Sequence, residues 1–325
     1  MTPVRWGFLG AGLVATSALA PAVHTAKGAV LQAVSARDRS RAAALGPRTA
    51  YDDYAALLAD PAVDAVYISL SNEAHLPWTL AALGAGKAVL CEKPLGLSAA
   101  EVDQMAVAAT EADRLLVEAS WYRWHPRVRL AQQRLAEVGG VRHVAAGFTF
   151  DGRLEGSYRL DPARGGGALY DVGCYPVSAC LWMVGRGLPE AVAARAAYGP
   201  SGVDMEAEVL LDWDGAQAEV RCGIRGREAQ WLVASGPGGQ VELPGAAFTS
   251  WTGDATRLEV SDGTGTERVD VPAVDAYRVM VEEVSSVLRG GPGWVLPLEQ
   301  SRQVAAVLDA AFASAAAGGG PVRPH

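Results

Sequence analysis

Hydrophobic residues in the first third of the chain occur in short runs separated by longer segments of mixed character. Strand-like runs cover residues 4–9, 29–35, 65–69 and 87–91. Helix-like segments lie at 15–26, 39–45, 54–58, 77–84 and 99–112. This alternation predicts a doubly wound α/β domain, in which helices cover both faces of a parallel sheet.

The pattern changes after residue 120. A basic helical segment at 126–135 precedes a strand at 142–150, a glycine-rich segment and three or four further strands. Apolar and polar residues alternate at 217–224, which suits an antiparallel sheet with one covered face. Two helices are predicted at 276–288 and 298–316, before a Gly/Pro tail that we expect to be frayed. We therefore predict two domains, a dinucleotide-binding domain over 1–120 and an α+β domain over 121–325 with a mostly antiparallel, open-faced sheet.

Composition and charge exclude several classes of partner. The net charge of -8 argues against a nucleic-acid ligand, which would need a basic surface. No apolar run is long enough to span a membrane. The four cysteines lie far apart without metal-binding spacing, so we expect reduced, buried thiols, no metal site and a cytoplasmic location.

The first strand runs directly into a G-x-G-x-x-A motif, formed by Gly10, Gly12 and Ala15. The first glycine permits a tight turn, and the second lets the backbone approach a pyrophosphate at the helix N-terminus. Alanine at the third position lets the helix lie close to the strand. Because the motif follows a strand and opens a helix, it predicts a dinucleotide site in a Rossmann-type domain rather than an ordinary turn.

The second predicted strand ends at Ala36 and Arg37, followed by Asp38. At this place a carboxylate binds the ribose hydroxyl of NAD, whereas an arginine accommodates the 2′-phosphate of NADP. Asp38 is well placed to cap the next helix. We therefore expect NADP(H) to be preferred, with NAD(H) as the alternative. Arg37 could instead be a solvated surface residue like Arg39 and Arg41.

Glu92, Lys93 and Pro94 follow the strand at 87–91. At the carboxyl end of a parallel strand, side chains point into the ligand crevice. A lysine there could donate a proton or polarise a substrate oxygen. From spacing alone, a surface Lys-Pro turn explains these residues equally well.

Residues 165–176 read GGGALYDVGCYP, with three glycines leading into a helical segment. Asp171 and Tyr175 are four residues apart, so they share one face of that helix. They are either site residues or, in the alternative interpretation, a solvated aspartate and a core tyrosine.

Five motifs occur in a specific order: GFLGAGLVA, DAVYISLSNEAH, VLCEKPLGLS, YRWHPR and YRLDPARGGGALYDVGCYP. On these motifs the chain resembles the glucose–fructose oxidoreductase / inositol dehydrogenase (Gfo/Idh/MocA) family over essentially its whole length. The resemblance implies an oxidoreductase that binds a nicotinamide cofactor in its first domain. It also implies that Lys93 is catalytic and that its bond to Pro94 is cis. The residues assigned to the cofactor are Gly10, Gly12, Leu13, Val14, Ala36, Arg37, Ser69, Leu70, Asn72, His75, Glu92 and Lys93.

The resemblance further implies that Asp171 and Tyr175 line the active site together with Lys93. The residues assigned to the substrate are Tyr122, Arg123, Tyr158, Arg159, Asp171 and Tyr175. Arg159 could instead form a structural salt bridge. Tyrosine at the last motif position is found in members such as xylose dehydrogenases, dihydrodiol dehydrogenases and deoxysugar ketoreductases.

The mechanism we expect is direct hydride transfer between the nicotinamide C4 and a carbinol or carbonyl carbon. In reduction, Tyr175 would donate a proton to the developing alkoxide, helped by the positive charge of Lys93. The reverse assignment, with Lys93 as the donor, stays open. Asp171 would orient the substrate hydroxyl or Lys93.

The leading function is therefore an NADP-dependent sugar or polyol oxidoreductase. The alternatives are dihydrodiol or anhydro-sugar chemistry on the same site, and a catalytically silent cofactor-binding regulator. Expected partners are a small molecule and further copies of the chain, because an exposed half-apolar sheet is normally covered. We expect a homodimer or homotetramer that binds neither nucleic acid nor membranes.

Overall fold

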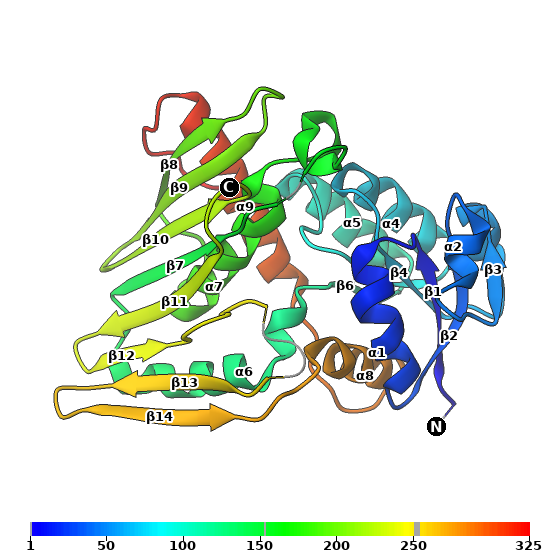
Figure 1. The fold of residues 1–325 in the computed structure, drawn as a ribbon, viewed down its shortest axis with the longest axis horizontal. Helices are drawn as coiled ribbons and strands as arrows, with labels where there is room; N and C mark the ends of the chain where they lie inside the picture. The colour runs from blue at the N-terminus through cyan, green and yellow to red at the C-terminus, as the bar shows by residue number, and fades with distance from the viewer. Residues whose placement is uncertain (1, 153, 250–253) are drawn as a thin grey trace. The chain divides into compact units, whose positions relative to one another are not determined.

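The computed structural model describes residues 2–152, 154–249 and 254–325 (Figure 1). The chain divides into two compact units. The first unit comprises Met1–Gly96, Ala100–Trp124 and Asp275–Leu298, and the second comprises Leu97–Ala99, His125–Val274 and Glu299–His325. A helical segment from near the end of the chain thus completes the first unit.

The first unit contains a six-stranded parallel sheet in the order β3-β2-β1-β4-β5-β6, which is typical of dinucleotide-binding Rossmann domains. Its strands are β1 (Val4–Leu9), β2 (Ala29–Ser35), β3 (Thr49–Tyr51), β4 (Ala65–Ile68), β5 (Ala88–Cys91) and β6 (Leu116–Glu118). Its helices are α1 (Ala20–Thr25), α2 (Arg39–Ala43), α3 (Tyr54–Ala59), α4 (His75–Gly84), α5 (Ala99–Glu111) and α8 (Ala276–Leu288), and a π-helical turn (Ala15–Leu19) precedes α1. The predicted Rossmann-type α/β fold is confirmed.

Burial explains why the strands of this sheet read as continuous apolar runs. Every residue of β4, β5 and β6 is buried, as expected for a sheet covered on both faces. Short polar residues begin the helices: Asp38 caps α2 by accepting the backbone N–H of Ser40, and Asp53 caps α3. The predicted capping role of Asp38 is therefore confirmed.

The second unit contains an eight-stranded sheet in the order β14-β13-β12-β11-β7-β10-β9-β8. Its strands are β7 (His143–Thr149), β8 (Ala191–Tyr198), β9 (Asp204–Trp213), β10 (Ala216–Gly223), β11 (Ala229–Gly236), β12 (Gly239–Glu242), β13 (Thr256–Ser261) and β14 (Thr266–Val271). Its helices are α6 (Pro126–Arg134), α7 (Cys174–Val184) and α9 (Leu298–Ala316), and a π-helical turn (Leu169–Gly173) leads into α7. Among the described strand pairs of this sheet, only β7 and β10 are parallel, so the predicted mostly antiparallel sheet is confirmed.

Two expectations about this unit are wrong. Seven strands follow the glycine-rich segment in the part of the chain that the structure describes, where we expect three or four. The C-terminal tail is also not frayed, because Val192 and Val322 exchange two backbone hydrogen bonds of 2.8 Å. The tail thus pairs with the edge strand β8.

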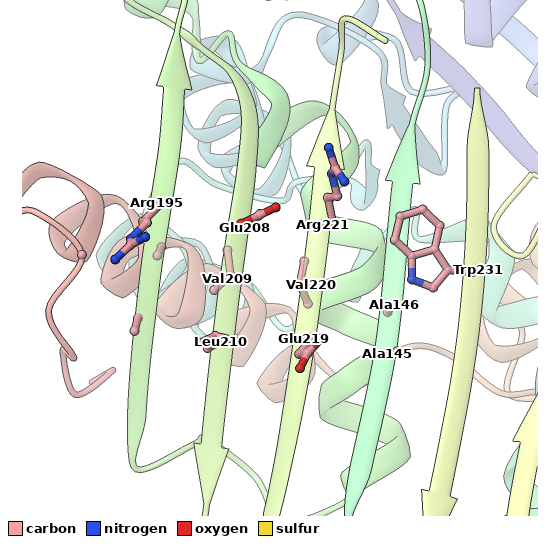
Figure 2. Close-up of a pocket in the computed structure, with 13 residues that line it drawn as sticks. Ala145, Ala146, Arg195, Glu208, Val209, Leu210, Glu219, Val220, Arg221 and Trp231 are labelled. Carbon is pink, nitrogen blue, oxygen red and sulfur yellow. The ribbon is translucent and has the colours of Figure 1, made fainter. Parts of the chain in front are cut away.

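The two faces of the eight-stranded sheet differ. Helix α7 packs against β7 and β10, and the alternate residues 218, 220, 222 and 224 are buried as predicted. Figure 2 shows the opposite face, from which charged side chains of β8, β9 and β10 project. On this face the Trp231 indole covers Gly147, where a Cβ atom would lie 2.1 Å from the ring. The absence of a side chain at Gly147 therefore makes room for the Trp231 indole.

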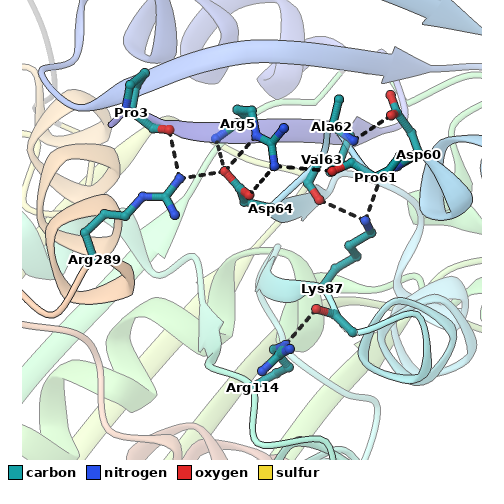
Figure 3. Close-up of polar contacts among 11 residues, drawn as sticks. Pro3, Arg5, Asp60, Pro61, Ala62, Val63, Asp64, Lys87, Arg114 and Arg289 are labelled. Carbon is teal, nitrogen blue, oxygen red and sulfur yellow. Dashed lines mark hydrogen bonds and ion pairs between the residues drawn. The ribbon is translucent and has the colours of Figure 1, made fainter. Parts of the chain in front are cut away.

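An ion cluster lies where β1 and β4 begin (Figure 3). Asp64 accepts hydrogen bonds from Arg5 at 2.8 Å and from Arg289 at 2.6 Å. Partial burial alone would raise the pKa of Asp64, but the hydrogen bonds from Arg5 and Arg289 outweigh it and lower the pKa to about 2. Nearby, the Lys87 ammonium donates to the carbonyls of Asp60 and Val63, both at 2.8 Å. The contacts of Asp64 join the starts of β1 and β4 to Arg289, which directly follows α8.

Helix α8 also contributes to the core of the first unit. The Trp6 indole donates to the hydroxyl of Ser285 at 3.1 Å. The rings of Trp121 and Tyr277 stack with their centroids 4.6 Å apart. The tightly buried side chains of β1 therefore depend on a helix almost 280 residues further along the chain.

The state of the cysteines and the character of the helices can be compared with the expectations from the sequence. All four cysteines are free and buried, as predicted. Within the described ranges, no helix combines the length and apolar character that crossing a membrane requires.

Candidate active site

The glycine loop of the first unit has the geometry that a dinucleotide needs. Gly10 has a φ of +101°, and a Cβ atom there would lie 2.3 Å from the carbonyl oxygen of Ser69, so only glycine fits. Over Gly12, by contrast, the nearest atoms to a Cβ are those of Ser69 at 3.8 and 3.9 Å, which leaves the backbone open to a ligand. Leu13 is 82% exposed beside this open backbone. The loop therefore fits a nicotinamide dinucleotide.

The end of β2 carries positive charge, and the nearby Asp38 carboxylate already accepts hydrogen bonds from Ser40 through Oδ1. Ala36 is buried, Arg37 is exposed, and Asp38 is occupied as the cap of α2. Arg41 on α2 donates from Nη2 to the carbonyl of Ala11 in the glycine loop at 2.6 Å. Arg41 is exposed, as expected for a surface residue, but its contact with the glycine loop could not be read from the sequence.

Arg37 and Arg41 also act on a common neighbour. Burial raises the pKa of Tyr54, and the charges of both arginines oppose that shift. The positive charges of both arginines therefore act on the same phenol, and Arg41 also contacts the glycine loop. Such a pair can hold a phosphate through charge-assisted hydrogen bonds.

Glu92 lies at the exit of β5 in a buried hydrogen-bond network. The Tyr67 hydroxyl donates to its carboxylate at 2.5 Å, and the backbone N–H of Lys93 donates to the second oxygen at 3.3 Å. Burial raises the pKa of Glu92, while the charge of Lys93 and the Tyr67 hydrogen bond oppose the shift. Tyr67 was missed from the sequence, because it reads as one more apolar position of β4.

The peptide bond between Lys93 and Pro94 is cis, as the family resemblance implied. His75, at the start of α4, contacts the carbonyl of Pro94 through Nδ1 at 2.8 Å and that of Leu70 through Nε2 at 3.3 Å. Its ring is fully buried, and burial lowers its pKa. His75 therefore joins the loop after β4 to the turn that carries Lys93.

Asp171 lies in the π-helical turn of the second unit and is buried. Its carboxylate forms an ion pair of 2.6 Å with Nε of Arg159. Burial disfavours the Arg159 guanidinium, but Asp171 outweighs this effect and raises the pKa of Arg159. Asp171 is thus not the solvated residue of the alternative interpretation. The salt bridge considered for Arg159 is present, with Asp171 as the partner.

Tyr175 and Tyr158 have different surroundings in the same unit. Tyr175, on α7, is buried with its ring tilted against Phe148 and Phe248, at centroid distances of 5.7 and 6.1 Å. The Arg159 guanidinium lies 5.1 Å from the centre of the Tyr158 ring. The structure thus brings Tyr158, Arg159 and Asp171 together through Arg159.

Tyr122 and Arg123 belong to the first unit in this structure. Both are buried, and the Arg123 guanidinium lies 5.6 Å from the centre of the Trp294 ring. Burial lowers the pKa of Arg123, while its attraction to Tyr122 and Glu118 opposes the shift. A role of these two residues toward the substrate stays a prediction, as do the ligand roles of the other residues.

Comparisons with known proteins agree with this geometry. Residues 4–120 match the model of an oxidoreductase family with an NAD-binding Rossmann fold, and residues 128–242 match the GFO/IDH/MocA C-terminal domain. D-xylose 1-dehydrogenase (NADP(+)) 2 of Haloferax volcanii is 36% identical, over 97% of this chain and 98% of that protein. Trans-1,2-dihydrobenzene-1,2-diol dehydrogenase of Mus musculus is 34% identical over 74% of each chain.

A solved structure extends the likeness to three dimensions. The 3-ketoreductase KijD10 from Actinomadura kijaniata, in complex with NADP and TDP-benzene, superimposes with a TM-score of 0.89 and 27% identity, over 96% of this chain and 98% of that one. Family models, full-length relatives and fold thus agree. The chain belongs to the Gfo/Idh/MocA family of NAD(P)-dependent oxidoreductases.

Proposed function

We propose that this protein is an NADP-dependent oxidoreductase that acts on a carbinol or carbonyl group of a sugar or polyol. The observation that carries the proposal is the 36% identity, over nearly the full length of both chains, to an NADP-dependent xylose dehydrogenase. Lys93, Asp171 and Tyr175 are all present in this chain, which a regulator without catalysis would not need.

The preference for NADP is supported by charge at the end of β2. Arg37 and Arg41 would bind the 2′-phosphate, and the buried methyl group of Ala36 leaves room for it. The open backbone at Gly12 would hold the pyrophosphate at the start of the helical segment. The NADP bound to the 3-ketoreductase supports the same preference.

When bound, the nicotinamide supplies hydride chemistry. The task of the chain is then to orient the substrate and to manage one proton. In reduction, we assign the donation of that proton to the Tyr175 hydroxyl, with the Lys93 ammonium favouring the phenolate that remains. The Asp171 carboxylate, fixed by Arg159, accepts a hydrogen bond from a substrate hydroxyl. Glu92 stabilises the ammonium of its neighbour Lys93.

A second candidate substrate class is a cyclic trans-diol. Relatives with this activity are 34% identical over three quarters of the chain. Such a substrate carries the same vicinal carbinols on an apolar ring. The two classes therefore differ in the polarity of the groups that surround the reacting carbon.

The deciding experiment is a panel of aldoses, polyols, ketoses and cyclic diols, assayed by the absorbance of the reduced cofactor with NADP and with NAD. We expect turnover of a sugar or polyol and a higher kcat/KM with NADP. Replacing Ala36 with Asp and Arg37 with Gln should reverse the cofactor ratio, because a charge-assisted phosphate contact is worth about ten- to hundred-fold in affinity. Cofactor binding without turnover of any compound would support the regulator instead.

We further propose that two copies associate through the face shown in Figure 2. This face contains a hollow of about 590 Å³, and Leu210 on it is 56% exposed. Arg195 and Arg221 lie among Glu208 and Glu219, so a two-fold axis would pair opposite charges. An apolar side chain among alternating charges suits a self-complementary interface.

A further inference from the structure

The glycines before the helical turn are required by close neighbours within the second unit. A Cβ atom on Gly166 would lie 2.5 Å from the carbonyl oxygen of Arg159. A Cβ atom on Gly167 would lie 2.0 Å from Oδ1 of Asp204, and Gly167 has a φ of +114° that disfavours other residues. The start of the turn is therefore pressed against Asp204, the first residue of β9.

Asp204 is a buried carboxylate, only 1% exposed, whose function the proposed mechanism leaves unexplained. Its Oδ2 accepts the backbone N–H of Leu169, the first residue of the π-helical turn, at 2.7 Å. A buried charge is costly unless it is hydrogen-bonded. The free N–H groups at the start of a helix supply such bonds.

Three further bonds connect this cap to the site. The backbone N–H of Gly167 donates to the carbonyl of Arg159, and that of Asp171 donates to the carbonyl of Gly167, both at 3.0 Å. The third bond is donated by Nε of Arg159 to the Asp171 carboxylate at 2.6 Å. Displacing the Leu169 end of the turn would therefore move Asp171 together with Arg159.

We propose that Asp204 is a positioning residue, which caps the Leu169–Gly173 turn from β9 and thereby fixes Asp171 and Tyr175 for the reaction. This inference rests on the proposed oxidoreductase function. Asp204 acts through Asp171 and Tyr175 and does not itself touch the substrate.

The cap is sensitive to pH. Burial raises the pKa of Asp204 to about 6, although hydrogen bonds from the backbone N–H groups of Leu169 and Ala168 oppose the shift. Protonation below this pH removes the charge that these donors stabilise, so the cap weakens as the pH falls.

Other titratable groups lie near Asp204. On β10, burial raises the pKa of the Cys222 thiol well above its usual value, so it stays neutral. Cys174 of α7 and Glu206 of β9 are the other groups that act on Cys222. Within the turn, the Asp171 carboxylate forms an ion pair with the Arg159 guanidinium.

The test compares Asp204→Asn, Asp204→Ala and Gly167→Ala with a matched control, Asp212→Asn, at an exposed position of the same strand. We expect kcat to fall about tenfold in Asp204→Asn, which keeps one acceptor, and about hundredfold in Asp204→Ala, the scale of a misplaced catalytic group. KM for NADP(H) should stay within about twofold of wild type, because the glycine loop belongs to the other unit. In wild type, kcat should fall below about pH 6, as Asp204 becomes protonated. This acid limb of the pH profile of kcat should be absent in Asp204→Asn, because an amide does not titrate.

Amide hydrogen exchange provides a readout that does not need turnover. In Asp204→Ala and Gly167→Ala, peptides covering residues 168–175 should exchange faster while those of β10 keep their protection. If wild type turns over no compound of the panel, the proposed function fails and exchange alone decides this inference. Unchanged exchange at 168–175, or an acid limb in Asp204→Asn equal to that of wild type, would overturn the role of Asp204.

Discussion

The ring of Tyr175 packs against Phe148 and Phe248. Phenylalanine keeps that packing. Lys93→Met similarly keeps most of the length of the lysine side chain and removes its charge. These two substitutions therefore isolate the two groups that could transfer the proton.

We predict that Lys93→Met lowers kcat by about 10²-fold or more, the usual scale for losing an acid–base group. If Tyr175 is the donor, Tyr175→Phe should lose as much, and the double variant should be little worse than either single one, because the two residues act as a unit. Steady-state kinetics of the three variants, with cofactor binding followed by nicotinamide fluorescence, measure this.

Tyr170→Phe is the matched control, because Tyr170 lies five residues earlier and donates to the backbone carbonyl of Leu97. It should keep kcat within a few-fold. A near-normal rate in Tyr175→Phe would assign the proton to Lys93, and a near-normal rate in Lys93→Met would remove Lys93 from the mechanism.

At the scale of elements, the Asp64 cluster joins the starts of β1 and β4 to the end of α8. The pKa of Asp64 is lowered in the folded chain, so its stabilisation is present above the unfolded value near 3.8 and is lost as the pH falls toward 2. Asp64→Asn should therefore reduce the free energy of unfolding at pH 7 by about 1–2 kcal/mol, after allowance for solvent screening. Urea unfolding of variant and wild type at pH 7 and pH 3 measures this.

Asp52→Asn, at an exposed carboxylate of the same unit, is the control and should change stability by less than about 0.5 kcal/mol. The gap between Asp64→Asn and wild type should narrow at pH 3. A gap that is equally large at both pH values would mean that packing, rather than the charge of Asp64, stabilises the cluster.

Sequence patterns predicted those helices and strands that bury a continuous stripe of apolar side chains. The bounds of α8 and α9 agree with the prediction, and β10 has the expected alternation. Two of the strands that were not predicted, β3 and β14, lack such a stripe, whereas β6 is buried but only three residues long. β3 has three residues, none fully buried, and β14 is exposed or half-buried at all but its last residue. Pairing with a neighbouring strand defines these elements, and a local pattern does not record pairing.

The candidate site was predictable where a local motif carries it. The glycine loop, the cis Lys93–Pro94 bond and the helical turn with Asp171 follow motifs in the sequence. Asp204 could not be found in this way, because it contacts Gly167 and Leu169 from a strand more than 30 residues away. The folded structure explains why glycine is required at position 167, because a Cβ atom there would collide with Asp204.

For the whole molecule, the open sheet face makes association the main prediction. Light scattering should give a mass of at least two chains of 33.8 kDa for wild type. Leu210→Arg should shift the protein toward monomers, because it adds an unpaired charge to the centre of the proposed interface.

Val107→Arg is the matched control, since Val107 is 57% exposed on α5 of the other unit and should leave the mass unchanged. A wild-type mass of one chain in dilute buffer would contradict the dimer. Equal dissociation by both variants would place the interface elsewhere.

The position of α8 along the chain has a consequence for synthesis. Domains generally fold as units, in N-terminal order, while the ribosome is still adding residues. Here the nucleotide-binding unit lacks the partner of Trp6 until Ser285 has been added. Its N-terminal parts, Met1–Gly96 and Ala100–Trp124, therefore leave the ribosome with an incomplete core, because α8 has not yet been made. Both units of this enzyme finish folding late, when almost the entire chain has been made.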